Sequence, residues 1–232
     1  MKALICSLVL LQASAAVAQG RIKNTTLPVP EVGMVSYGIS VPPDYRQDDP
    51  RPLIVALHAG GERIAYQGSR FMQEVVMPAL GGSGAIVIGP DCPDRSWVEP
   101  LADRSVLTLI EHVRATYAID PRRILVVGFS MGGRGAWTLS ERHADLFTAA
   151  IVMAASVRGE VEQGAGKVPT YIIHSRDDAV APFAPVAEAA RRLEAAGHPV
   201  RFDPIDGAGH NMSRYGEPMR RAAQWLAEQW AR

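Results

Sequence analysis

The stretch that decides the fold is ILVVGFSMGG, residues 124–133. Its first four residues are apolar and mostly β-branched, as in a strand that is buried on both faces of a sheet. Gly128 to Gly132 then form a G-x-S-x-G pattern around Ser130, and a helical pattern follows directly. Strand, sharp turn and helix are the context of a nucleophile elbow, in which glycines let a serine hydroxyl project above the sheet. The stretch therefore predicts a nucleophilic Ser130, and a helix N-cap serine is the simpler alternative.

Short apolar runs recur along the chain, bounded by glycine, proline or aspartate, and helical patterns lie between them. The runs occupy residues 53–57, 85–88, 149–152 and 171–173, and the helical patterns occupy residues 105–117, 133–142, 185–196 and 218–230. Residues 34–41 stop at Pro42-Pro43, which is typical of an edge strand, and residues 200–205 suit a last strand. The glycine-rich residues 156–169 predict a surface loop. This alternation predicts an α/β fold with a mostly parallel central sheet and helices on both faces. The length of the chain leaves little room for a separate domain, so we expect no large lid domain.

Composition indicates an ordinary globular protein. The chain has 232 residues, with 24 Lys and Arg against 24 Asp and Glu, and 47% of its residues are hydrophobic. This length suits one sizeable core, so we expect a single domain over residues 19–232. Because there is no net charge and no run of like charges, the sequence predicts neither a nucleic-acid partner nor binding to an anionic membrane.

The first 18 residues have the pattern of a secretory signal peptide. Lys2 precedes an apolar stretch, residues 3–11, and the segment ends in the small residues Ala16-Val17-Ala18. A membrane anchor is the alternative, but the apolar stretch is far shorter than the roughly 20 residues that span a bilayer. We therefore expect cleavage after Ala18, a secreted or periplasmic protein, and no stable membrane anchor after cleavage.

Cleavage would remove Cys6 and leave Cys92 as the one remaining cysteine. A single cysteine excludes an intramolecular disulfide and argues against a metal-thiolate cluster. Nothing near Cys92 in the sequence resembles an environment that activates a thiol, so we do not expect it to be a nucleophile. The sequence implies no metal ion and no organic cofactor.

A serine hydroxyl needs a base to accept its proton, and His210 is the best placed of the six histidines. It lies in a glycine-rich loop, residues 206–211, at the edge where the carboxyl ends of parallel strands present ligand-binding residues. Asp177 and Asp178 follow the strand at residues 171–173 and reach the same edge, so either carboxylate could orient His210. We favour Asp178, which completes the order serine, acid, histidine of the α/β-hydrolase fold.

Backbone N–H groups must face the oxyanion of a tetrahedral intermediate. The glycine-rich turn after the strand at residues 53–57 lies where hydrolases of this kind place one such donor. We expect the N–H groups of Gly60 and Met131 to be the two donors, with Ala59 as the alternative to Gly60. Trp97 is a candidate wall of the substrate pocket, and plain core packing is its alternative role.

These motifs resemble those of secreted α/β-hydrolase esterases, and the resemblance extends from Met34 to Trp230. The sequence is similar to a group that includes polyhydroxybutyrate-depolymerase-like esterases, feruloyl and acetylxylan esterases, the phospholipase/carboxylesterase family and predicted peptidases. The matching stretches are residues 41–45, 57–61, 89–93 with Trp97, 117–124, 128–133 and 174–182.

The resemblance implies roles for several residues in these stretches. It places the orienting acid at Asp178, and it makes His58 and His174 structural rather than catalytic. The sequence departs from the family pattern at Ala59, where glycine is usual, and at Ser175 and Ala181 in the acid loop.

Together these features predict a secreted serine hydrolase that cleaves carboxylic esters through an acyl-enzyme. We expect the substrate to be a small-molecule ester or an ester attached to a polymer. A peptidase or an acyltransferase could use the same triad, because the fold does not determine the leaving group or the acceptor. A non-catalytic binding protein is a third alternative. The sequence argues against it, because all three triad positions are filled in the expected order.

Overall fold

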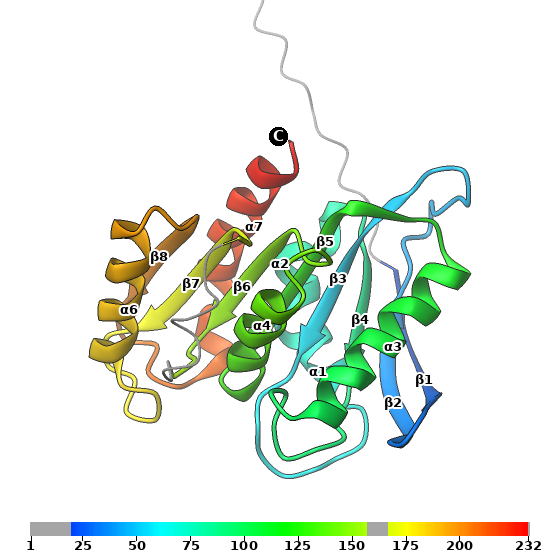
Figure 1. The fold of residues 1–232 in the computed structure, drawn as a ribbon, viewed down its shortest axis with the longest axis horizontal. Coiled ribbons are helices and arrows are strands. Elements are labelled where there is room, and N and C mark those ends of the chain that lie inside the picture. The colour runs from blue at the N-terminus through cyan, green and yellow to red at the C-terminus, as the bar shows by residue number, and fades with distance from the viewer. Residues whose placement is uncertain (1–19, 157–166, 232) are drawn as a thin grey trace, which may run out of the picture.

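The computed structural model describes residues 20–156 and 167–231. Within them, eight strands form one twisted sheet in the order β1-β2-β4-β3-β5-β6-β7-β8 (Figure 1). The strands are β1 (Ile22–Val29), β2 (Gly33–Ser40), β3 (Arg51–Leu57), β4 (Ile86–Pro90), β5 (Ile119–Phe129), β6 (Ala149–Met153), β7 (Thr170–Ser175) and β8 (Val200–Ile205). β1 and β4 each pair antiparallel with β2, and the other neighbours are parallel. The predicted α/β-hydrolase fold is confirmed.

Helices cover both faces of the sheet. α3 (Pro100–Thr116), α4 (Met131–Arg142) and α6 (Phe183–Ala195) pack on the face that is in front in Figure 1. The other face carries α1 (Gln67–Phe71), the π-helical turn η1 (Met72–Val76), α2 (Met77–Leu80) and α7 (Gly216–Trp230), with short 3₁₀ turns η2 (Gly81–Ser83) and η3 (Met212–Tyr215). Side chains of β3 point alternately to the two faces of the sheet. Val55 packs in the core layer under α3, α4 and α6, and Ile54 and Ala56 pack in the core layer under α1, α2 and α7. Burial on both faces explains why the central strands are continuously apolar.

Two sequence predictions fall partly or wholly outside the described residues. The predicted signal peptide, residues 1–18, is one, and residues 157–166 of the predicted surface loop are the other. None of the helices in residues 20–156 and 167–231 combines the length and the apolar character needed to cross a bilayer.

The prediction that residues 34–41 form an edge strand is wrong. β2 lies between β1 and β4, and β1 is the edge of the sheet. β1 has the sequence IKNTTLPV, whose polar residues conceal the alternation that identifies a strand. Pro28 belongs to this edge strand, where a missing N–H is tolerated.

The sequence pattern predicts no helix in the segment from α1 to η2, although the structure shows that the segment is almost entirely helical. α1 and α2 have five and four residues, and the π-helical turn η1 separates them. A π turn interrupts the period of 3.6 residues, so the apolar positions do not repeat at the spacing that predicts a helix.

The turn between β5 and α4 brings the helix into direct contact with the sheet. A Cβ atom at Gly132 would lie 1.9 Å from the carbonyl oxygen of Leu57, and a Cβ at Gly128 would lie 2.1 Å from the carbonyl oxygen of Gly132. Real Cβ atoms do not approach backbone this closely, so both positions require glycine. The first turn of α4 is therefore packed against the end of β3.

Replacing Gly132 with alanine should destabilise the protein by about 3 kcal/mol, the upper part of the usual range for overpacking, because backbone must move to admit the new methyl group. Gly82→Ala is the matched control, since nothing lies within 4 Å of a Cβ there; its effect should stay within about 0.5 kcal/mol. Denaturant unfolding measures both free energies of unfolding. Equal stability of Gly132→Ala and the wild type would contradict the close packing.

Candidate active site

Ser130 is the single residue between β5 and α4. Its φ of 56° and ψ of −114° are rare for a residue with a side chain, and such conformations cost on the order of 1–3 kcal/mol. The N–H of Ser130 donates to the carbonyl of Met153 at the end of β6, at 2.8 Å. The surrounding strands and glycines therefore hold Ser130 in a strained turn.

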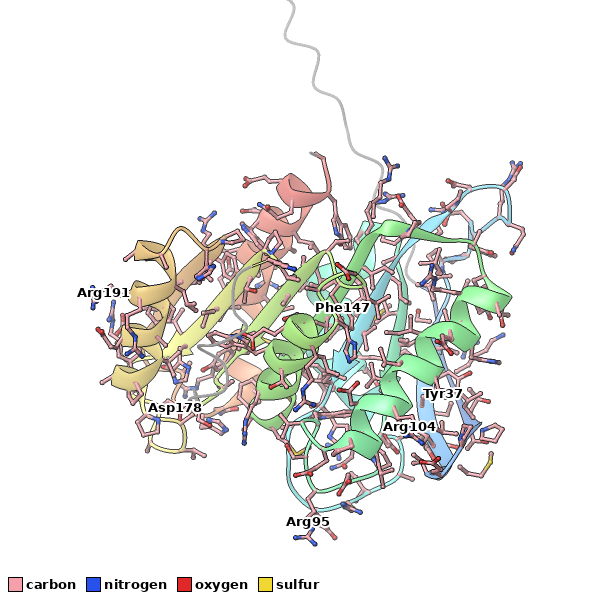
Figure 2. The ribbon with its side chains drawn as sticks, in the orientation of Figure 1. Tyr37, Arg95, Arg104, Phe147, Asp178 and Arg191 are labelled. Carbon is pink, nitrogen blue, oxygen red and sulfur yellow. The ribbon has the colours of Figure 1, made fainter. Side chains whose placement is uncertain are left out.

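Ser130, His210 and Asp178 form one hydrogen-bonded chain. Oγ of Ser130 lies 2.8 Å from Nε2 of His210, and Nδ1 of His210 lies 2.8 Å from Oδ2 of Asp178. A carboxylate only accepts hydrogen bonds, so Nδ1 carries the proton and Nε2 is free to accept the hydroxyl proton of Ser130. Figure 2 shows Asp178 at the edge of the sheet beyond the end of β7. The structure brings together the three residues that the sequence singled out.

Asp178 is held as an anion. Its side chain is fully buried, and Oδ1 accepts the N–H groups of Val180 and Ala181 at 2.9 and 2.8 Å. Burial alone raises the pKa of this carboxyl, but the hydrogen bonds from Ala181, His210 and Val180 outweigh it and hold the pKa below its ordinary value. Asp178 therefore stays ionised and can stabilise a positive charge on His210.

Asp177, the alternative acid, has a different set of partners. Its Oδ1 accepts the Ser175 hydroxyl and the N–H of Gly207 at 3.0 Å. The hydrogen bond from Ser175 is the main reason that the pKa of Asp177 lies below its ordinary value. Ser175 Oγ also accepts the N–H of Gly209 at 3.1 Å. Asp177 and Ser175 thus hold the loop that carries His210, while Asp178 contacts His210 itself.

Gly60 and Met131, the predicted oxyanion donors, are neighbours. Met131 is the first residue of α4, where an N–H has no acceptor within the helix. A Cβ at Gly60 would lie 3.4 Å from Sδ of Met131, so the oxyanion loop touches the start of the helix. The positive end of the α4 dipole adds to the attraction for a developing negative charge.

The side chain of His58 fixes the peptide that joins Ala59 to Gly60. Nδ1–H of His58 donates to the carbonyl of Ala59 at 2.7 Å, and its Nε2 accepts the N–H of Cys92 at 3.0 Å. In a trans peptide the carbonyl of Ala59 and the N–H of Gly60 point in opposite directions, so this N–H faces away from the His58 ring. Burial lowers the pKa of His58, which favours the neutral ring that both bonds require. These contacts are those of a structural residue, and they leave the N–H of Gly60, the predicted donor, unobstructed by the ring.

Trp97 packs in the core, the second of the two roles that the sequence left open for it, and is not a wall of a substrate pocket. Its side chain is 0% exposed, and its Nε1–H donates to the carbonyl of His58 at 2.9 Å. A Cβ at Gly135 of α4 would lie 2.3 Å from Cβ of Trp97, so the residue is packed tightly against that helix. Trp97 supports the oxyanion loop from within the core.

Two other residues behave as the sequence suggested. Burial raises the pKa of the Cys92 thiol to about 11, so it stays protonated and is a poor nucleophile. His174 is fully buried and donates from Nε2 to the carbonyl of Ala181 at 2.8 Å, which braces the acid turn. In the described ranges, no group of three or more His, Cys, Asp or Glu side chains is placed to hold a metal ion.

The sequence model of the dienelactone hydrolase family matches residues 96–232, more than half of the chain. The chain belongs to the dienelactone hydrolase family. This family member is similar to the probable feruloyl esterase C of Aspergillus niger, with 25% identity over 177 residues, covering 74% of this chain and 66% of the relative.

Solved structures show the same fold. One is a thermostable esterase with a TM-score of 0.74 and 26% identity, covering 89% of this chain and 62% of that one. Another is FphF, a fluorophosphonate-binding serine hydrolase of Staphylococcus aureus, with a TM-score of 0.75 and 14% identity, covering 90% of this chain and 99% of that one. This dienelactone hydrolase family member spans about two thirds of the length of the feruloyl esterase and somewhat less of the thermostable esterase.

Asp178→Asn should slow the reaction of Ser130 with a fluorophosphonate probe by a factor on the order of 10⁴, because the amide no longer holds His210 in the required tautomer. Asp177→Asn is the matched control, since the amide oxygen can still accept the N–H of Gly207; its rate should fall by about threefold or less. Both rates are measured by quenching the labelling reaction at successive times and determining the labelled fraction by intact-mass spectrometry. A larger loss in Asp177→Asn would show that the acid is misassigned.

Proposed function

We propose that this protein is a serine esterase that cleaves carboxylic esters through an acyl-enzyme. Ser130 is the nucleophile, His210 the general base and Asp178 the acid that orients His210. The observation that carries the proposal is the hydrogen-bonded chain through these residues, with both contacts at 2.8 Å. Membership of the dienelactone hydrolase family and the likeness to esterases support the same activity.

In the acylation step, Oγ of Ser130 attacks the ester carbon while its proton passes to Nε2 of His210. The carbonyl electron pair moves to the oxygen, and the N–H groups of Gly60 and Met131 stabilise the resulting oxyanion; one such donor is worth about 10²–10³ in rate. As the tetrahedral intermediate collapses, the C–O bond breaks and Nε2–H of His210 protonates the departing alcohol. The acyl group is left bonded to Ser130.

Deacylation repeats these steps with water as the nucleophile. His210 takes a proton from the water molecule as the water oxygen bonds to the acyl carbon. A second oxyanion then forms in the same place. His210 then returns the proton to Oγ of Ser130 as the acid departs. Asp178 stays ionised throughout and stabilises the imidazolium in both halves of the reaction, consistent with the direction of its pKa.

The proposal extends to substrate and location. The substrate is a small-molecule ester or an ester attached to a polymer, and the protein is secreted or periplasmic. The pattern of residues 1–18 supports export, with a cationic start, an apolar stretch and a small-residue ending.

Ser130→Ala should lower kcat on p-nitrophenyl esters by about 10⁶, because both halves of the reaction need the serine oxygen. Circular dichroism and thermal unfolding of the variant test that its fold is kept. Peptide p-nitroanilides, run in parallel with the wild type, separate an esterase from a peptidase. Undiminished hydrolysis by Ser130→Ala, or cleavage of the anilides alone, would refute the proposed activity.

Export is tested by expressing the full chain in a bacterial host with a periplasm. We expect the mature protein in the periplasm or the medium, with Gln19 as its first residue. N-terminal sequencing decides the point, and a cytoplasmic protein that keeps residues 1–18 would contradict export.

A further inference from the structure

We propose that the acyl group of the ester binds in a small pocket between the oxyanion loop and α1, and that this pocket selects short, uncharged acyl groups. The inference rests on the proposed function and names its substrate class. The pocket has a volume of about 120 Å³, and its lining includes Gly60, Ile64, Phe71 and Met212, with Arg70 and Glu74 among its polar residues.

The position of the pocket assigns it to the acyl side. Gly60, the proposed oxyanion donor, forms part of its wall and contacts Met131, the residue that follows Ser130, whereas neither Ser130 nor His210 lines the pocket in the described residues. The leaving oxygen must stay beside Nε2 of His210 to receive a proton. The acyl group, in contrast, stays bonded to Ser130 after the alcohol has departed and needs a binding site of its own beside the oxyanion loop.

The pocket is partly open to solvent, and the volume within its walls suits a short acyl group. An apolar cavity of about 150 Å³ holds benzene, so a volume of about 120 Å³ holds roughly a four-carbon chain. A feruloyl group, with an aromatic ring and a three-carbon chain, exceeds this volume. The pocket therefore favours a shorter acyl group than the name of the Aspergillus niger relative indicates.

The apolar residues of the wall differ in how far they can move. Phe71 is 1% exposed and belongs to the core layer on this face of the sheet, where dense packing prevents it from moving aside for a longer chain. Ile64 is 40% exposed, so its side chain can be shortened or lengthened without disturbing the core. Ile64 is therefore the position at which the length preference can be altered.

The two charged residues that line the pocket carry opposite charges that offset each other. Arg70 and Glu74 lie one helical turn apart, and their charged groups approach within 3.5 Å. An acyl group with a terminal carboxylate would be attracted by Arg70 but repelled by Glu74. The pair therefore gives a carboxylate no net advantage, and an uncharged group with an apolar body suits the pocket better.

Asp91 anchors the start of α1, the helix that carries Arg70 and Phe71 of the pocket wall. Asp91 accepts the N–H groups of Tyr66 and Gly68 at 2.7 and 2.9 Å. Tyr66 has φ 62° and ψ 37°, the left-handed region, and the π-helical turn η1 follows α1. Strained residues and π turns are frequent at functional sites. The carboxylate of Asp91 keeps the wall in this conformation before substrate arrives.

The test uses p-nitrophenyl acetate, butyrate and octanoate together with a feruloyl ester. For the wild type, kcat/KM should be highest for acetate or butyrate and at least tenfold lower for octanoate and the feruloyl ester. Ile64→Ala should raise the octanoate to butyrate ratio of kcat/KM by about tenfold, and Ile64→Phe should lower the butyrate to acetate ratio by about tenfold, the low end of the effect of one methylene in an apolar pocket.

Leu101→Ala is the matched control. Leu101 is 38% exposed, close to the 40% of Ile64, and it does not line the pocket. The variant should keep the wild-type chain-length profile.

The charge preference is tested with p-nitrophenyl hemisuccinate against butyrate. Glu74→Gln leaves the positive charge of Arg70 unbalanced and should raise the hemisuccinate to butyrate ratio by about threefold, as expected for exposed charges. The gain should disappear in high salt, because added ions screen exposed charges.

A wild-type preference for octanoate or for the feruloyl ester would overturn the inference. So would an effect of the Ile64 variants on a series of acetate esters of different alcohols, with no change in the acyl profile. The proposed function fails by a different result, retained hydrolysis in Ser130→Ala, whatever the chain-length profile.

Discussion

The contact between the first turn of α4 and the end of β3 is the constraint on which the site depends. Because only a hydrogen atom separates the Cα of Gly132 from the carbonyl of Leu57, the helix begins directly above the strand end. That approach leaves one residue to reverse the chain, and Ser130 takes a strained conformation to do so. Met131, the first residue of this helix, lies next to Gly60 through its side chain. The positions of the proposed nucleophile and of the proposed donor Met131 thus depend on one packing contact.

Polar side chains, buried at His58 and Ser175 and exposed at Asp177, hold the two loops that complete the site. On one side, the His58 ring forms hydrogen bonds with the carbonyl of Ala59 and the N–H of Cys92, and the carbonyl of His58 accepts a hydrogen bond from Trp97. On the other side, Ser175 and Asp177 bond to the backbone of the histidine loop. Each loop would otherwise be free to change conformation. Side chains outside the hydrogen-bonded chain of Ser130, His210 and Asp178 therefore hold the two loops that flank it.

The central part of the fold and the residues of the hydrogen-bonded chain could be predicted from the sequence. Strands buried on both faces are continuously apolar, and the order of Ser130, Asp178 and His210 follows the order of those strands along the chain. The edge strand β1 could not be predicted, because Lys23, Asn24 and the threonines that follow them face solvent for the most part. Its place in the sheet comes from pairing with β2, which is a tertiary contact.

The pocket and the position of Trp97 were also beyond the sequence. The segment from α1 to α2 has no regular period, so nothing in its pattern places Ile64 and Phe71 beside Gly60. Trp97 lies in a stretch without helix or strand, and only the fold shows that α4 covers it. Ser175 stands where the esterases that this sequence resembles usually have glycine. Its role becomes clear only in the structure, where its hydroxyl forms a hydrogen bond with the loop that carries His210. Sequence patterns identify reacting groups better than they identify the walls around them.

The most direct test of this account is a crystal structure of the protein after reaction with a p-nitrophenyl phosphonate that carries a short alkyl group. The account predicts phosphorus bonded to Oγ of Ser130, with the phosphoryl oxygen within hydrogen-bond distance of the N–H groups of Gly60 and Met131 and the alkyl group beside Ile64. An adduct on another residue, or a phosphoryl oxygen that faces away from these two N–H groups, would contradict it.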